Sequence, residues 1–347
     1  MSSTCRAYLE LARISNVPTV LSNAMAGAAC AAFRDPLAIQ LAPVVAASAA
    51  CAAFYVAGMA LNDVFDREID RVERPQRPIP SGRVTTRGAV LFAATLIVSG
   101  LALLALVNLL ALVAGCALVV CILFYDLIHA TAKWSVLIMG TCRGLVYVVG
   151  ALAIGVPESP IYVLVPAMVL LLYVASFSVI ARREAITFAS APRFQCGSCG
   201  YPSMRDRGRC SECGHEFSAQ QPDSIVFVDA VPVRHMRVVI LLSILLLCPV
   251  AIFGLVDLNP RVSDSLNIAL GVGALCSCAL ILACTNSAAR LVTQKPPKIG
   301  PAVMLWIATI SIYDAYVMFL ARSLPLAMIA FVCFALTRWA QRRIAGT

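Results

Sequence analysis

The chain has 347 residues, of which 61% are hydrophobic and only 13% are charged, and its formal net charge is +9. Its mean hydropathy of +0.87 excludes a soluble globular domain and predicts a polytopic membrane protein. Basic loops on the cytoplasmic side of a membrane account for the positive charge. We therefore expect no nucleic-acid partner.

Windows of about 20 apolar residues predict the membrane-spanning helices. A charged amphipathic lead-in precedes the first window, and no small-residue cleavage site follows a short apolar core, so we expect no cleaved signal peptide. The predicted fold is an all-α membrane bundle of nine or ten transmembrane helices. Its spans are expected near residues 17–33, 38–61, 88–107, 109–128, 135–155, 161–180, 238–257, 266–285, 301–320 and 323–340.

A polar insert divides the predicted bundle into two parts. We expect residues 1–189 to form its N-terminal part, residues 190–235 the insert, and residues 236–347 its C-terminal part. Most of the 27 Lys and Arg residues fall in alternate connections and near the two ends of the chain. Because such residues accumulate on the cytoplasmic side, we predict an inner or plasma membrane protein with both termini and the insert in the cytoplasm.

The second predicted span ends in a cluster of acids, formed by Asp63, Asp66 and Asp70 beside Asn62. If the helix continues through Asp70, the three carboxylates share one face. Carboxylates this close repel one another unless a cation compensates. Mg2+ takes a few protein oxygens and completes its shell with water and substrate phosphate. The pattern therefore predicts a magnesium and diphosphate site at the cytoplasmic face.

A basic, proline-rich loop follows the acids, with Arg71, Arg74, Arg77 and Arg83 within residues 71–84. The prolines end the helix and stiffen the loop. Planar guanidinium groups suit phosphate oxygens. The alternative interpretation is ordinary positive loop charge on the cytoplasmic side.

Three isolated polar residues have competing interpretations. Arg143 lies about two turns into the fifth span, where an unpaired charge is costly, so we expect it to face a cavity or a partner such as Asp126. Asp314, in the ninth span, is interpreted either as an acceptor or proton site or as a polar helix contact. His129, near a helix end, is interpreted as a solvated loop residue.

The fifteen cysteines form two groups. Those at the N-terminus and in the spans are interpreted as small hydrophobic residues. The insert carries a Cys-x2-Cys-x10-Cys-x2-Cys pattern at Cys196, Cys199, Cys210 and Cys213, whose spacing predicts a structural Zn2+ site resembling a short zinc ribbon. A reducing cytoplasm disfavours disulfides, and a redox pair needs only two cysteines. A protein partner for this ribbon stays a hypothesis.

The acidic segment and the loop after it resemble the first signature of a known family, the UbiA superfamily of intramembrane prenyltransferases. The matching residues read Asn62-Asp63-x2-Asp66-x3-Asp70, followed by Arg74-Pro-x-Arg77-Pro-Ile-Pro-Ser-Gly. Tyr125-Asp126 with Lys133 agrees with the resemblance, which covers nearly all of the chain except about 190–235. The overall pattern is most similar to the EboC-like branch.

The resemblance implies an enzyme, a prenyltransferase that moves an isoprenyl group from an allylic diphosphate to an aromatic or lipid acceptor in the bilayer. It implies that Asp63, Asp66 and Asp70 hold catalytic Mg2+, with Asn62 as a further oxygen donor. The diphosphate would be held by basic residues. These are Lys133, Arg77, Arg143 and Arg182.

The sequence departs from the family pattern at the end of the sixth span. A second acidic cluster is expected there, but Glu184 is the sole acid between Ser176 and Glu184. This favours an alternative, a protein of the same fold that binds or transports a prenyl or other hydrophobic ligand without catalysis. A membrane anchor that presents the insert is a third hypothesis, although an anchor has no need for mutually repelling carboxylates.

Overall fold

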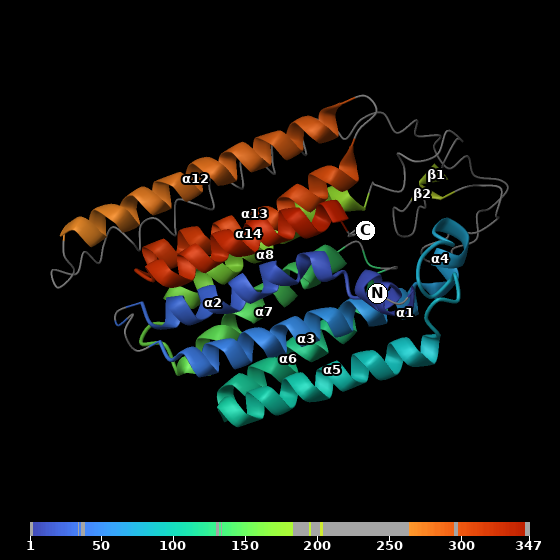
Figure 1. The fold of residues 1–347 in the computed structure, drawn as a ribbon, viewed down its shortest axis with the longest axis horizontal. Coiled ribbons are helices and arrows are strands. Elements are labelled where there is room, and N and C mark those ends of the chain that lie inside the picture. The colour runs from blue at the N-terminus through green and yellow to red at the C-terminus, as the bar shows by residue number, and fades with distance from the viewer. Residues whose placement is uncertain are drawn as a thin grey trace.

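The computed structural model describes residues 3–33, 35, 39–129, 132, 134–182, 194–195, 202–203, 264–294 and 298–343. Over these residues the chain is an elongated helical bundle (Figure 1). The described strands are the short antiparallel pair β1 (Phe194–Gln195) and β2 (Pro202–Ser203).

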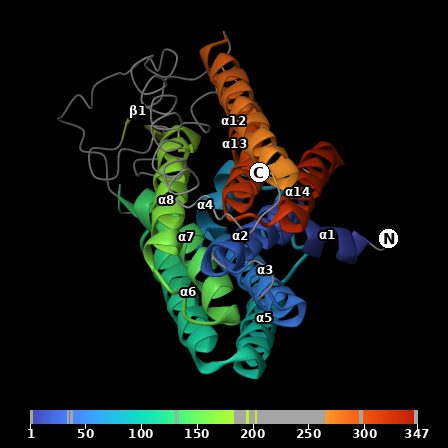
Figure 2. The same cartoon turned by 90° about the vertical axis from the view of Figure 1, so that its left-hand side faces the viewer.

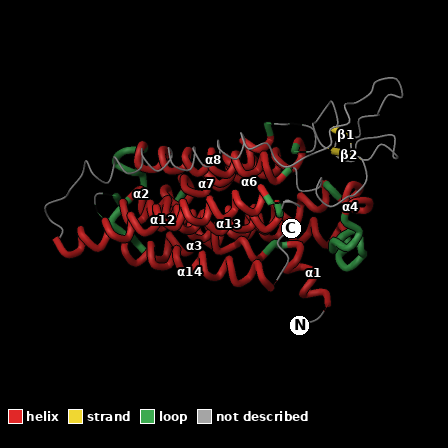
Figure 3. Tube along the Cα trace, turned by 90° about the horizontal axis from the view of Figure 1, so that it is seen from above, coloured by secondary structure: helices red, strands yellow, loops and turns green. Residues whose placement is uncertain are grey.

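The helices before the insert are α1 (Ser3–Leu11), the 3-10 helix η1 (Ile14–Asn16), α2 (Val17–Ala31), α3 (Leu41–Phe65), α4 (Arg67–Glu73), α5 (Thr86–Val107), α6 (Leu109–Ile128), α7 (Ser135–Ile154) and α8 (Ile161–Ala181). Those after it are α12 (Asp264–Thr293), α13 (Ile299–Leu320) and α14 (Leu324–Arg343). The long helices run side by side along the long axis (Figure 3).

Eight described helices are long and apolar enough to cross a membrane. α2 is not one of these eight, because it has only 15 residues, but it packs between them. These helices correspond to the predicted spans except the one at 238–257, which lies outside the described residues. The predicted total of nine or ten spans therefore stays a prediction. The four insert cysteines, Lys133 and Glu184 also lie outside the described residues, so the zinc site is untested.

The core lies where α2 meets its neighbours. α2 packs against α3, α7, α13 and α14 and lies in the interior of the bundle (Figure 2). Residues 308–319 of α13 are all buried. By contrast, α5 exposes large apolar side chains such as Leu91 and Leu106, as expected of a helix that faces lipid.

Local sequence explains where two of the helices begin. The Thr85 hydroxyl accepts a hydrogen bond from the backbone N–H of Gly88 at the start of α5, and Asn108 caps α6 in the same way through Ala111. The Asn108 amide also donates to the carbonyl oxygens of Leu152 and Ala153 at 2.9 and 3.1 Å. One side chain thus starts α6 and ties it to the end of α7.

The condition under which the three acids would share one helical face, an uninterrupted helix through Asp70, is not met. α3 ends at Phe65, Asp66 takes a non-helical conformation with φ −83° and ψ 2°, and α4 begins at Arg67. The backbone N–H of Asp66 still donates to the Asn62 carbonyl at 2.9 Å, so the chain bends rather than unwinds. Because of this bend, the acids are not arranged as one straight helical face.

Candidate active site

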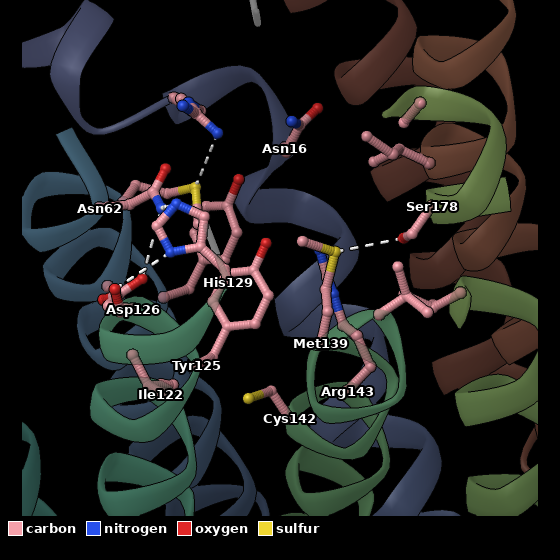
Figure 4. A pocket seen from close by; sticks show the side chains of 18 of the residues that line it. Asn16, Asn62, Ile122, Tyr125, Asp126, His129, Met139, Cys142, Arg143 and Ser178 are labelled. Carbon is pink, nitrogen blue, oxygen red and sulfur yellow. Dashed lines mark hydrogen bonds between the residues drawn. The ribbon is translucent and has the colours of Figure 1, made fainter. Parts of the chain in front are cut away.

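A cavity of about 370 Å³ lies among the helix ends that carry the acidic segment. Its polar part is lined from α3, α4, the loop after α4, and the adjoining ends of α6 and α8. Its deeper part is lined by apolar side chains that include Leu118, Val146 and Ile310. Figure 4 shows Asn62, Asp126 and His129 gathered on one side of this cavity, with Met139 and Ser178 across from them.

Two of the predicted metal ligands converge on one arginine. Arg77 Nη1 lies 2.7 Å from Asp70 Oδ2 and 3.3 Å from Asp63 Oδ1. Arg13 Nη2 lies 3.2 Å from the same Asp63 oxygen. The Arg77 side chain is only 11% exposed. The repulsion that the sequence predicts between the carboxylates is therefore offset here by guanidinium groups.

The third acid turns to a different partner. Asp66 Oδ1 lies 2.9 Å from His129 Nε2. Asn62 Nδ2 is 3.5 Å from both His129 Nε2 and Asp126 Oδ1. His129 is 9% exposed, so its interpretation as a solvated loop residue is wrong: the end of α6 packs onto the acidic segment and buries the ring.

The burial of these charges perturbs their protonation. Burial raises the pKa of the Asp70 carboxyl above its ordinary value, and the neighbouring Arg77 offsets only part of this effect. Burial and the positive charge of Arg13 lower the pKa of Arg77. Both shifts reflect charges removed from water, which a bound cation and an anionic ligand would further compensate.

The donor set fits Mg2+, but the carboxylates are not arranged around a metal. Among the described residues, no three His, Cys, Asp or Glu side chains form a group that could hold an ion as they stand. Carboxylate and amide oxygens are nevertheless the ligands that Mg2+ prefers. One further buried oxygen, Asp126 Oδ2, has no hydrogen-bond partner among the residues that the structure describes. Metal binding at Asp63, Asp66 and Asp70 therefore stays a prediction.

Arg182 lines the cavity and also joins two helix ends. Its Nη2 donates to the carbonyl oxygens of His129 and Ala132 at 2.9 and 3.1 Å, and it contacts the Ser135 hydroxyl. The same side chain thus holds the end of α6 against the start of α7. Its predicted role as a diphosphate ligand remains untested.

Arg143 faces the cavity from α7. This is the first of its two expected settings; the other, a partner such as Asp126, is not found, because Asp126 lies at the polar end with Asn62. The guanidinium Nη1 instead donates to Thr19 Oγ1 at 3.1 Å and to Asn23 Oδ1 at 3.0 Å, and the group lies 5.4 Å from the Tyr55 ring centroid.

Asp314 is a polar helix contact, which was one of its two interpretations. It is fully buried and is absent from the lining of the cavity. Its oxygens accept hydrogen bonds from Ser22 at 2.5 Å, from Asn23 at 2.8 and 3.0 Å, and from Tyr147 at 2.6 Å. The carboxyl group therefore joins α13 to α2 and α7.

Sequence reasoning gave no site role to Arg13, which pairs with Asp63 across 50 residues of sequence. It noted Asp126 as part of the family resemblance and as a possible partner for Arg143, but it did not place Asp126 beside Asn62 and His129. No sequence spacing predicts that Arg13 contacts Asp63 or that Asp126 contacts Asn62, because these residues meet only when the helices pack.

Comparison with known proteins shows where the chain has relatives. Residues 20–186 match the model of the UbiA prenyltransferase family. The chain is 35% identical to digeranylgeranylglyceryl phosphate synthase of Haloquadratum walsbyi over 162 aligned residues. The alignment covers 44% of this chain and 52% of that protein. The chain is 45% identical over 103 residues to the synthase of the same name from Methanopyrus kandleri, covering 30% and 36%. The match thus spans about a third to a half of these relatives.

Solved structures share the fold over most of their length. A UbiA homologue from Aeropyrum pernix K1 superposes with a TM-score of 0.58 at 21% identity, covering 86% of this chain and 96% of that one. A UbiA homologue from Archaeoglobus fulgidus, solved with GPP and Mg2+, gives a TM-score of 0.55 at 16% identity, covering 95% and 99%. At these identities the likeness concerns the helical architecture.

Proposed function

From the match of residues 20–186 to the model of the UbiA prenyltransferase family, we propose that the protein is a Mg2+-dependent membrane prenyltransferase of that family. It would transfer an isoprenyl group from an allylic diphosphate to a hydrophobic acceptor. The acceptor class is proposed as aromatic or lipid. The name of the curated relatives, digeranylgeranylglyceryl phosphate synthase, favours a lipid.

The observation that carries the proposal is a group of paired charges at the polar end of an apolar cavity. Asp66 and Asp70 line the cavity, and Asp63 pairs with Arg13 and Arg77, which line it too. A bound diphosphate would bring negative charge to the arginines of this cluster, and a bound cation would bring positive charge to its carboxylates. Arg77 can then exchange its carboxylate partners for phosphate oxygens, while Asp63 and Asp70 are released for the metal. Arg13 is placed to make the same exchange.

In the proposed reaction the allylic C–O bond breaks and its electron pair leaves with the diphosphate. The acceptor forms a bond to the allylic carbon and loses a proton. Mg2+, held by the three aspartates with Asn62 nearby, would supply positive charge to the departing diphosphate. Arg77, together with the predicted ligands Lys133 and Arg182, would stabilise the same charge by hydrogen bonds. The apolar walls would keep water from the allylic cation.

The test is release of diphosphate from allylic diphosphates by purified protein in detergent, with a pool of aromatic and lipid acceptors, with and without Mg2+. Asp63→Ala and Asp66→Ala should each abolish metal-dependent release. Glu68→Gln is the matched control, because Glu68 is 62% exposed on α4 and pairs with the neighbouring Arg67 and Arg71. Unchanged release in the Asp63→Ala, Asp66→Ala double variant would refute the proposal.

A specific observation favours a second candidate, a carrier of prenyl ligands. At the described end of α8, Ser178 donates to Met139 Sδ at 3.2 Å and Arg182 is engaged with helix ends, so no acid faces the cavity there. Binding of an allylic diphosphate without its cleavage would support this candidate.

A further inference from the structure

The deep part of the cavity contains a cation among apolar walls. Arg143 follows Ser135, the first residue of α7, by eight positions, which places it about 12 Å farther along the helix axis. The residues that line the cavity around this level include Leu118, Val146 and Ile310. A guanidinium at such a depth is costly unless something offsets its charge.

The Arg143 side chain is fixed in position by neutral groups. Its Nη1 donates to Thr19 Oγ1 and Asn23 Oδ1, and the Tyr55 ring lies against the guanidinium. Within the described part of the chain, its Nε and Nη2 make no hydrogen bond to the protein. Arg143 is among the residues that line the cavity, so a ligand there can accept hydrogen bonds from these donors.

The nearest compensating charge lies behind a neutral side chain. Asn23 accepts from Arg143 through Oδ1 and donates through Nδ2 to Asp314. The Asp314 oxygens are occupied by Asn23, Ser22 and Tyr147, and no described carboxylate contacts the guanidinium. Asp314 thus helps the empty protein tolerate the cation without occupying its donors.

We propose that Arg143 binds an anionic oxygen group, carboxylate or phosphate, on the acceptor substrate. This rests on the proposed prenyl transfer at the same cavity. The planar guanidinium can grip two oxygens of such a group at once. With its anion held at Arg143, the acceptor would point its reacting atom toward the polar end, where the allylic diphosphate is proposed to bind. Arg143 is thereby reassigned from the diphosphate to the acceptor.

The test measures binding of acceptor probes to the purified full chain without any diphosphate present. Two matched pairs separate the sources of the anion: 4-hydroxybenzoate with its methyl ester, and a monoalkylglycerol phosphate with the monoalkylglycerol. The wild-type protein should bind at least one anion about tenfold or more tightly than its neutral partner, as expected for hydrogen bonds between charged groups. Arg143→Gln should remove that preference, and Arg143→Lys should keep part of it.

Two controls keep a folding defect apart from a lost contact. Arg342→Gln removes an exposed arginine from α14 and should leave the preference intact. Arg143→Gln should still bind geranyl diphosphate with Mg2+ as the wild type does. A neutral probe that binds as well as its anion in both pairs, no binding of any probe, or a preference that survives in Arg143→Gln would each overturn the proposal. Loss of geranyl diphosphate binding in Arg143→Gln would return the residue to the diphosphate site and also overturn it.

Because the assay contains no diphosphate, its outcome is independent of catalysis. A protein that shows the anion preference but releases no diphosphate would refute the transferase and keep Arg143 as a ligand site. A protein that transfers prenyl groups but shows no anion preference would support the transferase and refute the role of Arg143.

Discussion

Individual arginines neutralise the buried carboxylates of the acidic segment when no ligand is bound. Asp63 and Asp70 are almost fully buried, with relative exposures of 4% and 2%. Two buried carboxylates near one another are unfavourable, and Arg77 contacts both of them. The same arrangement makes Arg77 a stability element in the empty protein and a candidate phosphate ligand in the loaded one.

We predict that Arg77→Ala destabilises the metal-free protein by about 3 kcal/mol, because it leaves buried carboxylates without their counterion. Added Mg2+ should restore part of the loss by replacing the missing charge. Thermal unfolding in detergent, with and without Mg2+, measures both effects.

The matched control is Arg71→Ala, since Arg71 is 63% exposed and pairs with the equally exposed Glu68. Its loss should cost less than about 1 kcal/mol. Equal unfolding midpoints for the two variants would show that Arg77 has no special structural role.

At the level of elements, two glycines set the contact between α2 and α7. A Cβ added at Gly27 would lie 2.0 Å from the Tyr147 carbonyl oxygen, and one added at Gly150 would lie 2.0 Å from the Ala24 carbonyl oxygen. Both contacts are with backbone, which cannot turn aside. This close approach brings Asn23 of α2 and Tyr147 of α7 within hydrogen-bonding distance of Asp314.

Gly27→Ala and Gly150→Ala are therefore expected to push the two helices apart and destabilise the bundle by about 3 kcal/mol each. Gly271→Ala, on α12, is the matched control. A Cβ there meets nothing within 4 Å, and alanine favours a helix by about 0.5–1 kcal/mol over glycine.

Unfolding midpoints and the size-exclusion profile of each variant would check this. A Gly27→Ala protein as stable as Gly271→Ala would mean that α2 and α7 do not approach as described.

Across the whole molecule, one end gathers the features that the charge distribution assigns to the cytoplasm. α1, α4 and the C-terminal end of α14 lie toward the same end of the bundle (Figure 1). α7 begins at Ser135, near the acidic segment, and ends at Ile154. The connection between α7 and α8 therefore lies at the opposite end of the bundle. The structure holds no membrane, so the side to which each end faces is a prediction from the basic residues.

An impermeant maleimide tests that orientation in intact cells. We expect it to label Val156→Cys, in the connection between α7 and α8 where Val156 is 73% exposed, but not Gln76→Cys in the loop after α4. Both should be labelled after the cells are broken, over the background of the parent protein. Labelling of Gln76→Cys in intact cells would invert the proposed topology.

The sequence by itself determined the spans that the structure describes, the acidic segment and its basic loop. Hydropathy suffices for the spans because each membrane helix satisfies its own backbone hydrogen bonds within one continuous apolar segment. The described helices therefore match their predicted windows closely. The cluster of acids was visible for a similar reason, since its residues are neighbours in sequence.

Only the tertiary structure decided the partners of these groups. Arg13 with Asp63, His129 with Asp66, and Asn23 with Asp314 are separated by 50, 63 and 291 residues. Their meeting depends on the bend at Asp66 and on helices that pack at glycine contacts. Local patterns carry no information about such pairs, because the energy that selects them comes from burying charged and polar groups together after the helices have assembled.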